Sequence, residues 1–496
     1  MKIKNKKTYF LCIICLVLFT IGIVHKELEN DTYFTIATGN YIVNNGINED
    51  EPFTYHKNLK FTKIRWAFDI VVSQIYNISG FKGLYVFLLI VAIIIAITLF
   101  TLLIKSGNNK IVAMFIVVFA MFFSKEYLKC RAQIISYLLF IIELYCIQKL
   151  LKTNEKKYSI SLIAISYLIL SFHSSVWLVY FLLYIPYLVE YILMHIKVLK
   201  NMKLNCKFVI ERRNIKLLII TMIIAIIMGF LTPLGISPFT YIPKVMNGIS
   251  TKFIVELQPV LGLEKGFPIC VIILISLMIF FTKTRVRLVD LFLILGFITM
   301  SILAERNLYI ALFVLSYPIA RIIDDFLKKY NKYKFVENLD IYINDKIQPK
   351  IIIMLIFIYM CIANYKEIYL EEYVNEMQFP VEATEYIKQN LDVENIRIYN
   401  DFNFGSYLEF RGIPVFLDSR SEIYTKEFNN VDILKDWVEY EIFGNGNIET
   451  IIDKYNITHL VVYYNKNYSN YYGKYKFARI YYDDCFAIYE VTQRYK

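Results

Sequence analysis

The chain has 496 residues, of which 57% are hydrophobic and 17% aromatic, and its formal net charge at pH 7 is +11. A soluble globular domain does not need so much apolar surface, which excludes a purely soluble protein and indicates that the lipid bilayer is the main solvent. The positive charge gathers in short connections between apolar runs, as the positive-inside rule describes. This placement excludes a nucleic-acid-binding surface as the reason for the charge.

The N-terminus joins a basic stretch, "MKIKNKK", to the apolar run "YFLCIICLVLFTIGIV". The sequence that follows, "HKELEND", has no small-residue cleavage site, so we predict an uncleaved signal anchor that forms the first transmembrane helix. The eight cysteines are scattered along the chain and predict neither a disulfide framework nor a zinc site.

Further apolar runs predict a polytopic α-helical membrane protein with about 11 transmembrane helices in residues 1–365. The predicted spans are 9–25, 83–104, 110–124, 132–151, 158–172, 176–196, 215–232, 267–281, 288–303, 308–323 and 350–365. With a cytoplasmic N-terminus, basic connections such as "KTRVR" and the segment 197–216 with Lys203 and Lys207 face the cytoplasm. We therefore predict a multi-pass protein of the cell membrane whose C-terminal part is extracytoplasmic.

The first external loop, 26–82, carries two predicted amphipathic helices, 32–45 and 64–78, that could lie on the membrane interface. Asp31 precedes the first of them, and Gly46 marks its end. Asp31 is either the N-cap of this helix or a group that takes part in chemistry, and the two roles are compatible.

The last segment, 366–496, differs in kind from the rest. Its short β-rich runs are "VENIRIYN", "GIPVFLDS", "ITHLVVYY" and "CFAIYEV", and between them "VEATEYIKQNL" and "NIETIIDKYN" have helical spacing of apolar residues. This pattern predicts an external soluble α/β domain.

Under the predicted topology, polar residues near the span ends fall on the same external face. They are Asp31, Arg131, Gln133, His173, Glu256, Gln258, Glu305 and Arg306. Polar groups at that depth are costly unless they are used or paired. Arg131 and Arg306 could instead be interfacial anchors, and His173 a surface residue of its turn. Glu143, inside a span, is expected to hydrogen-bond to a neighbouring helix.

Several motifs occur in a characteristic order. They are "DTYFTIATG" at 31–39, "EPFTY" at 51–55, "RWAFDIVVSQIY" at 65–76, "RAQIISYLLF", "FLTPLG", "VELQP", "ERNLYIALF" and "NDFNFGSYLEFRGIPVFLDSRSEIY" at 400–424. At these residues the chain resembles the GT-C superfamily of polytopic glycosyltransferases, which take a sugar from a polyprenyl-phosphate-linked donor. Within that group it is similar to bacterial mannosyltransferase- and oligosaccharyltransferase-like membrane proteins.

The resemblance implies a transferase, inverting at the sugar, that acts on an extracytoplasmic glycan, lipid or protein acceptor. It implies that Asp31 is the catalytic carboxylate, and that Arg131, Arg306 and His173 bind the donor phosphate. Glu256, Gln258, Gln133 and Glu305 would bind the acceptor or act as supporting polar residues. The resemblance leaves open a divalent cation such as Mg²⁺ or Mn²⁺, for which Asp31 would be the ligand.

Two other classes of function stay open at this point. A transporter or flippase of a lipid-linked glycan intermediate would need charges or broken helices near the bilayer midplane, and apart from Glu143 the predicted spans contain few charges. A non-catalytic membrane scaffold could have the same fold. A polymerase-type enzyme usually places its large external loop late among the spans, whereas here the prominent external parts are the first loop and the C-terminal segment.

Overall fold

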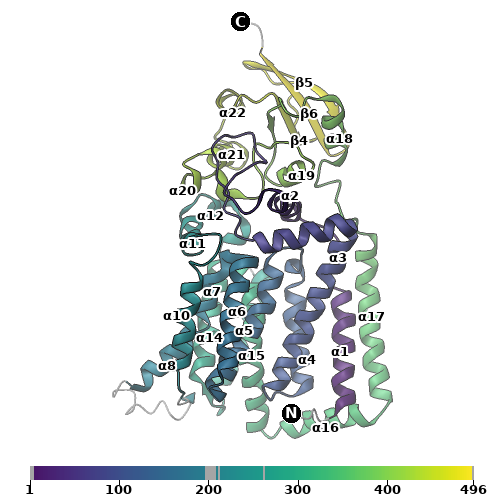
Figure 1. Ribbon diagram of the computed structural model, residues 1–496. Coiled ribbons are helices and arrows are strands. Elements are labelled where there is room, and N and C mark those ends of the chain that lie inside the picture. The colour runs from purple at the N-terminus through teal and green to yellow at the C-terminus, as the bar shows by residue number, and fades with distance from the viewer. Residues whose placement is uncertain (1–4, 196–207, 210–212, 261–262, 494–496) are drawn as a thin grey trace. The chain divides into compact units, whose positions relative to one another are not determined.

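The computed structural model describes residues 5–195, 208–209, 213–260 and 263–493. The chain divides into two compact units (Figure 1). The first, here called the bundle unit, comprises Met1–His25, Tyr85–Phe239 and Val255–Leu370. The second, here called the sheet unit, comprises Lys26–Leu84, Thr240–Ile254 and Glu371–Lys496. The predicted external loop and the predicted C-terminal domain therefore contribute to the same compact unit. Most of the predicted cytoplasmic segment 197–216 lies outside the described residues.

The bundle unit is built of helices around one buried helix, α15 (Arg306–Lys329). Every residue of α15 from Leu308 to Ala320 is buried. The helices that pack against it are α4 (Lys110–Phe123), α5 (Gln133–Thr153), α13 (Leu263–Phe280), α14 (Leu288–Leu303) and α16 (Tyr333–Asp345). The unit also contains the part of α3 (Trp66–Lys105) from Tyr85 onward and the helices α1 (Lys6–Ile21), α6 (Lys156–His173), α7 (Trp177–Leu182), α8 (Ile185–His195), α10 (Lys216–Met228) and α17 (Gln348–Leu370). A helical stretch that is apolar on all sides needs other helices or lipid around it, and in α15 the stretch Leu308–Ala320 is covered by neighbouring helices.

The outer faces of these helices expose large apolar side chains. Examples are Phe115, Ile160, Ile227, Leu277 and Leu355, each about half exposed or more. Such surfaces are costly in water and are typical of helices that face lipid. Within the described ranges, four helical stretches are long and apolar enough to cross a membrane, and several shorter apolar helices accompany them. The long stretches are Trp66–Lys105, Gln133–Thr153, Lys156–His195 and Gln348–Tyr365. Four is fewer than the eleven spans that the sequence predicts.

The helix α3 (Trp66–Lys105) contains a break at Gly80. Its backbone there has φ 61° and ψ −158°, a conformation that glycine adopts without the steric cost of a Cβ atom. The break separates the two stretches that the sequence predicted as an interfacial helix over 64–78 and a span over 83–104. The two predicted helices therefore follow each other directly at a kink, without a loop between them.

The sheet unit contains a four-stranded sheet of order β3-β4-β6-β5. Strand β3 (Ile398–Tyr399) is parallel to β4 (His459–Tyr463), whereas β6 (Phe486–Gln493) is antiparallel to both β4 and β5 (Tyr475–Tyr482). The runs "VENIRIYN", "ITHLVVYY" and "CFAIYEV" correspond to β3, β4 and β6. Strand β5 was not predicted, because the polar residues of "YKFARIYY" interrupt the alternation of apolar and polar residues that is typical of a strand. In the bundle unit, β1 (Phe208–Val209) and β2 (Val286–Arg287) form a short parallel pair.

The prediction of a strand in "GIPVFLDS" is wrong. In the described structure this segment joins no sheet, and Val415 forms a single bridge with Thr54. The Val415 N–H donates to the Phe53 carbonyl oxygen at 3.1 Å, and the Thr54 hydroxyl donates to the Val415 carbonyl oxygen at 2.7 Å. The apolar run is buried by its contact with the first loop instead of by strand pairing.

Helices surround the sheet and connect its strands. They are α18 (Val381–Asn390), α19 (Gly405–Phe410), α20 (Lys426–Asn429), α21 (Ile433–Glu441), α22 (Ile448–Tyr455) and, from the first loop, α2 (Asn30–Asn45). Helix α2 packs against α19 and also closely approaches the first turn of α3. A Cβ atom at Gly39 would lie 2.0 Å from the Asp69 carbonyl oxygen, so only glycine permits this approach.

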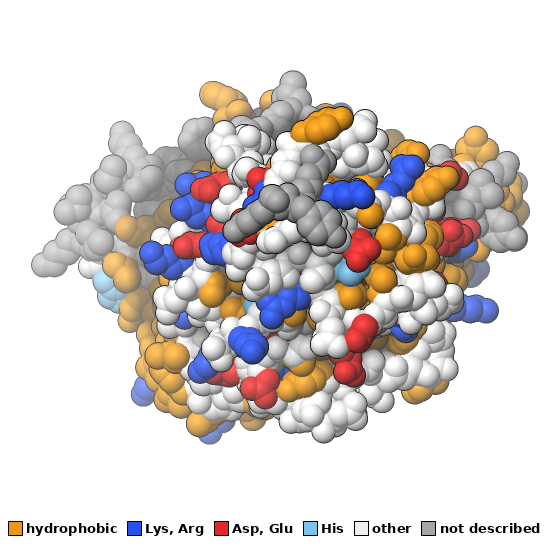
Figure 2. All heavy atoms as spheres, turned by 90° about the horizontal axis from the view of Figure 1, so that it is seen from above, with side chains coloured by type: hydrophobic (Ala, Val, Ile, Leu, Met, Phe, Trp, Pro, Cys, Tyr) orange, Lys and Arg blue, Asp and Glu red, His pale blue; other side chains and the backbone are white. Residues whose placement is uncertain are grey.

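The surface seen from above mixes both signs of charge. Figure 2 shows basic and acidic side chains interspersed on this face, without a broad area of one charge among the residues it colours. A mixed charged surface of this kind is typical of protein in contact with water.

The interior of the sheet unit holds an unusual charge cluster around Arg420. Its Nη1 lies 2.7 Å from Glu51 Oε2, and its Nη2 lies 3.0 Å from Glu409 Oε2 and 2.6 Å from Asp418 Oδ2. The Tyr424 hydroxyl donates to Asp418 at 2.5 Å. The side chains of the four charged residues are at most 1% exposed. One guanidinium group therefore joins the first loop to two separate segments of the C-terminal part.

The three carboxyl groups of this cluster do not share the charge equally. Burial raises the pKa of Glu409 well above its usual range, and burial also raises the pKa of Glu51 although Arg420 opposes the shift. Burial would raise the pKa of Asp418 as well, but the charge of Arg420 and hydrogen bonds from Arg420 and Tyr424 outweigh it and lower this pKa. Asp418 is therefore the carboxylate that balances Arg420, and Glu409 favours its neutral form.

We predict that Arg420→Met destabilises the sheet unit by about 3–5 kcal/mol, because it leaves buried carboxylates without a counter-charge. Glu409→Gln should cost less than about 1 kcal/mol, since it replaces a carboxyl group that favours its neutral form. The measurement is thermal unfolding of the purified protein in detergent, with protease resistance of the sheet unit as a second readout. Equal losses in the two variants would contradict the assignment of charge.

His56 predicts a pH dependence of stability. Its Nε2 lies 2.8 Å from the Phe416 carbonyl oxygen. Burial lowers its pKa to about 4, although the bond to Phe416 opposes the shift. In the unfolded chain, a histidine has a pKa of about 6.5 and therefore binds a proton at a higher pH than His56 does in the folded protein. The contribution of His56 to the free energy of unfolding is therefore complete above pH 6.5 and is lost as the pH falls from 6.5 toward 4. The expected loss between pH 7.5 and 5 is about 2 kcal/mol from this residue. His56→Gln should remove this part of the pH dependence of the unfolding temperature, and an unchanged profile would refute the prediction.

Candidate functional site

Arg131 forms an ion pair in the bundle unit. It lies two residues before the start of α5, and its Nη1 lies 2.8 Å from Oε1 of Glu256. The side chains are 18% and 31% exposed, so the pair is neither fully buried nor free in solvent. The structure thus brings together two of the predicted site residues that are 125 positions apart in the sequence.

Glu256 belongs to a short helical turn, η4 (Val255–Leu257), that is linked to the start of α15. The Gln258 carbonyl oxygen accepts a hydrogen bond from the Glu305 N–H at 3.0 Å, and the Val260 N–H donates to the Ile302 carbonyl oxygen at 3.2 Å. These backbone bonds hold the η4 segment beside the residues that begin α15. Glu256, Gln258 and Glu305 therefore lie in one connected structure.

Glu305 accepts a hydrogen bond from the Tyr127 hydroxyl at 3.1 Å. The ring of Tyr127 stacks on Tyr309, with centroids 3.5 Å apart. Burial, followed by the charge of Glu256, raises the pKa of Tyr127 above its usual range, so this hydroxyl stays protonated and acts as a donor. Sequence reasoning missed Tyr127, and the signal that could have found it is an aromatic residue in the external connection 125–131.

His173 ends α6 and contacts α5. Its Nδ1 lies 2.7 Å from the hydroxyl oxygen of Ser136, and the imidazole is buried, so the interpretation of His173 as a surface residue is wrong. Gln133, the first residue of α5, has a buried side-chain carbonyl oxygen that accepts no hydrogen bond from the described residues. Both residues lie within the first turn of α5 or against it.

Seven of the eight predicted site residues thus gather at the end of the bundle where α5 and α15 begin and α6 ends. Arg306 is the first residue of α15. The N-termini of two helices carry partial positive charge, and the guanidinium groups of Arg131 and Arg306 add to it. These N–H donors can bind phosphate oxygens, while the carboxylates of Glu256 and Glu305 in the same cluster offset part of the positive charge.

Asp31, the eighth residue, belongs to the sheet unit. Helix α2 begins at Asn30 and its N-cap is Glu29, so the interpretation of Asp31 as the N-cap is wrong. Asp31 lies in the first turn and is partly exposed, where the helix dipole stabilises a carboxylate. Gly46 follows the end of α2 with φ 77°, as the sequence predicted.

The residues after Asp31 fix the start of α2. Tyr33 is fully buried among four aromatic rings, those of Phe81, Phe379, Tyr407 and Phe410. Phe34 lies beneath two guanidinium groups, with Arg65 at 4.2 Å and Arg420 at 5.7 Å from the ring centroid. Because Tyr33 and Phe34, two and three residues after Asp31, are packed in this way, they fix the backbone of the first turn of α2, to which Asp31 belongs.

Asp31 does not sit in a ready-made metal site. Among the described residues, no group of three or more His, Cys, Asp or Glu side chains is placed to hold a metal ion. The described residues therefore offer no preformed set of three such ligands for the Mg²⁺ or Mn²⁺ that the sequence left open at Asp31.

The expectation for Glu143 is wrong. This residue of α5 is fully buried, but neither carboxyl oxygen has a hydrogen-bond partner among the described residues. It does not bond to a neighbouring helix as predicted.

No protein-family model matches the chain, and no curated protein matches it. Solved structures do resemble it. One is the oligosaccharyltransferase of Archaeoglobus fulgidus, tethered with an acceptor peptide (TM-score 0.56, 12% identity, 92% of this chain and 69% of that chain). Another is ArnT of Cupriavidus metallidurans in the apo state (TM-score 0.56, 10% identity, 98% and 97%). The same ArnT bound to undecaprenyl phosphate also matches (TM-score 0.54, 8% identity, 98% of each chain).

Both proteins are GT-C glycosyltransferases, so the expected likeness to that superfamily is confirmed at the level of fold. At these identities the likeness concerns the backbone architecture of a helical membrane protein with a C-terminal sheet domain. The match to ArnT extends over nearly the whole of both chains.

The Arg131–Glu256 pair should contribute a small but measurable coupling energy. We predict about 0.5–1 kcal/mol from a double-mutant cycle of Arg131→Ala and Glu256→Ala, because the side chains are only partly exposed. The more exposed Lys125–Glu126 pair, 3.5 Å apart, is the matched control and should show almost no coupling. Both coupling energies are measured from unfolding temperatures in detergent. Equal coupling energies for the two pairs would contradict the prediction.

Proposed function

We propose that this protein is a GT-C-like glycosyltransferase that moves a sugar from a polyprenyl-phosphate-linked donor to an extracytoplasmic glycan, lipid or protein acceptor. The observation that carries the proposal is the likeness over 98% of both chains to ArnT bound to undecaprenyl phosphate. The likeness to an oligosaccharyltransferase with a tethered acceptor peptide supports the same class of reaction.

The donor phosphate is assigned to the cluster at the starts of α5 and α15. As the bond between the anomeric carbon and the phosphate oxygen breaks, negative charge grows on the lipid phosphate. Arg131 and Arg306 can donate charge-assisted hydrogen bonds to it, and His173 can add a further donor. Glu256 pairs with Arg131, and a backbone hydrogen bond holds Gln258 beside Glu305 at the start of α15. Gln133, Glu256, Gln258 and Glu305 are assigned as acceptor-binding or supporting polar residues. A donor with a polyprenyl tail also explains why such a cluster belongs to a helical membrane unit.

Asp31 is assigned as the catalytic carboxylate. In an inverting transfer, the acceptor hydroxyl attacks the anomeric carbon from the side opposite the phosphate. A bond forms from the acceptor oxygen to that carbon, the bond to the phosphate oxygen breaks, and the hydroxyl proton passes to Asp31.

The proposed setting is the cell membrane, with a cytoplasmic N-terminus and an extracytoplasmic C-terminal domain. The exposed apolar faces of the bundle unit support a multi-pass arrangement. The count of about eleven spans, which includes shorter apolar helices, is part of the proposal.

The test is to incubate the purified protein with a panel of polyprenyl-phosphate sugars and to measure donor binding and sugar transfer or donor hydrolysis. We expect Asp31→Asn to lower turnover at least about 100-fold, since general base catalysis contributes that much, with donor binding unchanged. Arg306→Ala should affect donor binding instead, and we expect the donor to bind about tenfold more weakly to this variant.

Asp50→Asn is the matched control, because Asp50 is an exposed acid of the same first loop. It should leave both quantities and the membrane abundance unchanged. Full turnover in Asp31→Asn would overturn the assignment of the catalytic residue. Donor binding by none of the panel would overturn the proposed donor class.

A further inference from the structure

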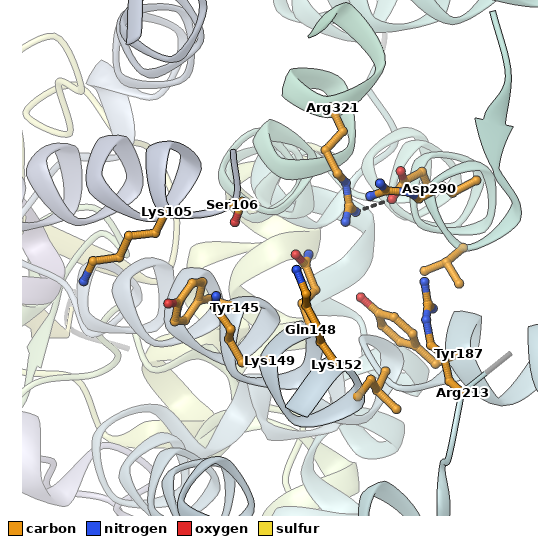
Figure 3. Close-up of a pocket in the computed structure, with 13 residues that line it drawn as sticks. Lys105, Ser106, Tyr145, Gln148, Lys149, Lys152, Tyr187, Arg213, Asp290 and Arg321 are labelled. Atoms are coloured by element: carbon orange, nitrogen blue, oxygen red, sulfur yellow. Dashed lines mark hydrogen bonds and ion pairs between the residues drawn. The ribbon is translucent and has the colours of Figure 1, made fainter. Parts of the chain in front are cut away.

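A second polar region of the bundle unit is a cavity of about 460 Å³ at the other end of α5 (Figure 3). It is lined by the last turns of α5, the end of α3, Tyr187 of α8, Asp290 of α14 and Arg321 of α15. The α5 residues that line the cavity, Tyr145 to Lys152, lie 12 to 19 positions after Gln133, so about 18–28 Å of helix separate them from its start. The cavity is therefore distinct from the cluster assigned to the donor phosphate.

The lining of the cavity is strongly cationic. Six basic residues line it, and the one acidic residue among the described lining residues is Asp290. Asp290 is paired with Arg321, and Arg213 is paired with Glu190 at 2.9 Å. The basic side chains that line the cavity thus outnumber the acidic side chains paired with them, Asp290 and Glu190. The cavity is partly enclosed, which strengthens the electrostatic attraction of an anion.

Three buried donors in the cavity wall have no hydrogen-bond acceptor among the described residues. They are the Tyr187 hydroxyl, the Gln148 amide nitrogen and Nε of Arg321. Tyr187 is only 3% exposed, and in Figure 3 the side chains of Gln148, Tyr187 and Arg321 point toward a common space. Buried donors without acceptors are rare in folded proteins. A ligand with several acceptor oxygens would satisfy all three, whereas a cation would satisfy none.

We propose that this cavity binds a phosphate group, held by Lys149, Lys152 and Arg321 together with the hydroxyl of Tyr187 and the amide of Gln148. Phosphate offers the negative charge and the acceptor oxygens that the wall lacks. Two sources share this chemistry, the headgroup of an anionic phospholipid and a soluble phosphate compound. By the basic character of its connections, this end of the bundle is the one predicted to face the cytoplasm, where anionic headgroups attract basic pockets. The proposal does not depend on the glycosyltransferase assignment.

The experiment uses the full chain and two probes. Inorganic pyrophosphate is titrated into the protein in neutral detergent, and its binding is measured by calorimetry and by the shift of the unfolding temperature. In the second arm the protein is placed in nanodiscs of phosphatidylcholine with or without phosphatidylglycerol, and bound lipid is counted by native mass spectrometry. If pyrophosphate binds, a soluble phosphate compound is enough to occupy the cavity. If phosphatidylglycerol is retained and pyrophosphate does not bind, the ligand is the headgroup of an anionic lipid.

Two variants locate the binding. Lys149→Gln with Lys152→Gln removes two charges, and Tyr187→Phe removes one hydroxyl while keeping the ring. Each should weaken binding of the effective probe by about tenfold. The matched control is Lys156→Gln with Lys157→Gln, which removes two exposed charges at the start of α6 outside the cavity. This control variant should bind the effective probe with the affinity of the unchanged protein. Binding of neither probe, or equal weakening in the control, would overturn the proposal.

Discussion

The sheet unit depends on one buried guanidinium group whose hydrogen-bond partners are carboxyl groups from separate segments. Arg420 reaches Glu51 of the first loop and Glu409 and Asp418 of the C-terminal part, and all four side chains are buried. A buried charge is tolerated only when its partners are in place, so the segments must come together for any of them to be stable. Phe34 packs beneath Arg420, and Asp31 lies three residues before Phe34 in the chain. The geometry of the proposed catalytic carboxylate therefore rests on this cluster.

Much of the architecture follows from local sequence patterns. Hydrophobic runs predicted the helices of the bundle unit, because a helix in lipid must be apolar over most of its surface. The helical spacing after Asp31 predicted α2, and β-branched and aromatic runs predicted β3, β4 and β6. The grouping of Arg131, His173, Glu256 and Glu305 was also predictable, since it needed only the order of the spans and the ends at which polar residues occur.

Long-range pairing could not be read in this way. Nothing local distinguishes Glu51 or Glu409, which are buried, from exposed acids such as Asp50, because the difference lies in partners from other segments of the chain. The segment "GIPVFLDS" has the composition of a strand, yet Val415 meets the first loop instead of a sheet. His173 was harder still, because a histidine at a turn gives no sign that Ser136 of another helix covers it.

The two ends of α5 show that charge alone does not define a site. At its start, Arg131 is paired with Glu256 and the backbone of the η4 segment is held by hydrogen bonds, so the groups there are positioned before a ligand arrives. At its other end, basic residues outnumber their partners and buried donors lack acceptors among the described residues. The positive-inside rule accounts for the number of basic residues at such an end but not for buried, uncharged donors such as Tyr187 and Gln148. Their burial without acceptors requires a second cause, and a bound anion supplies one.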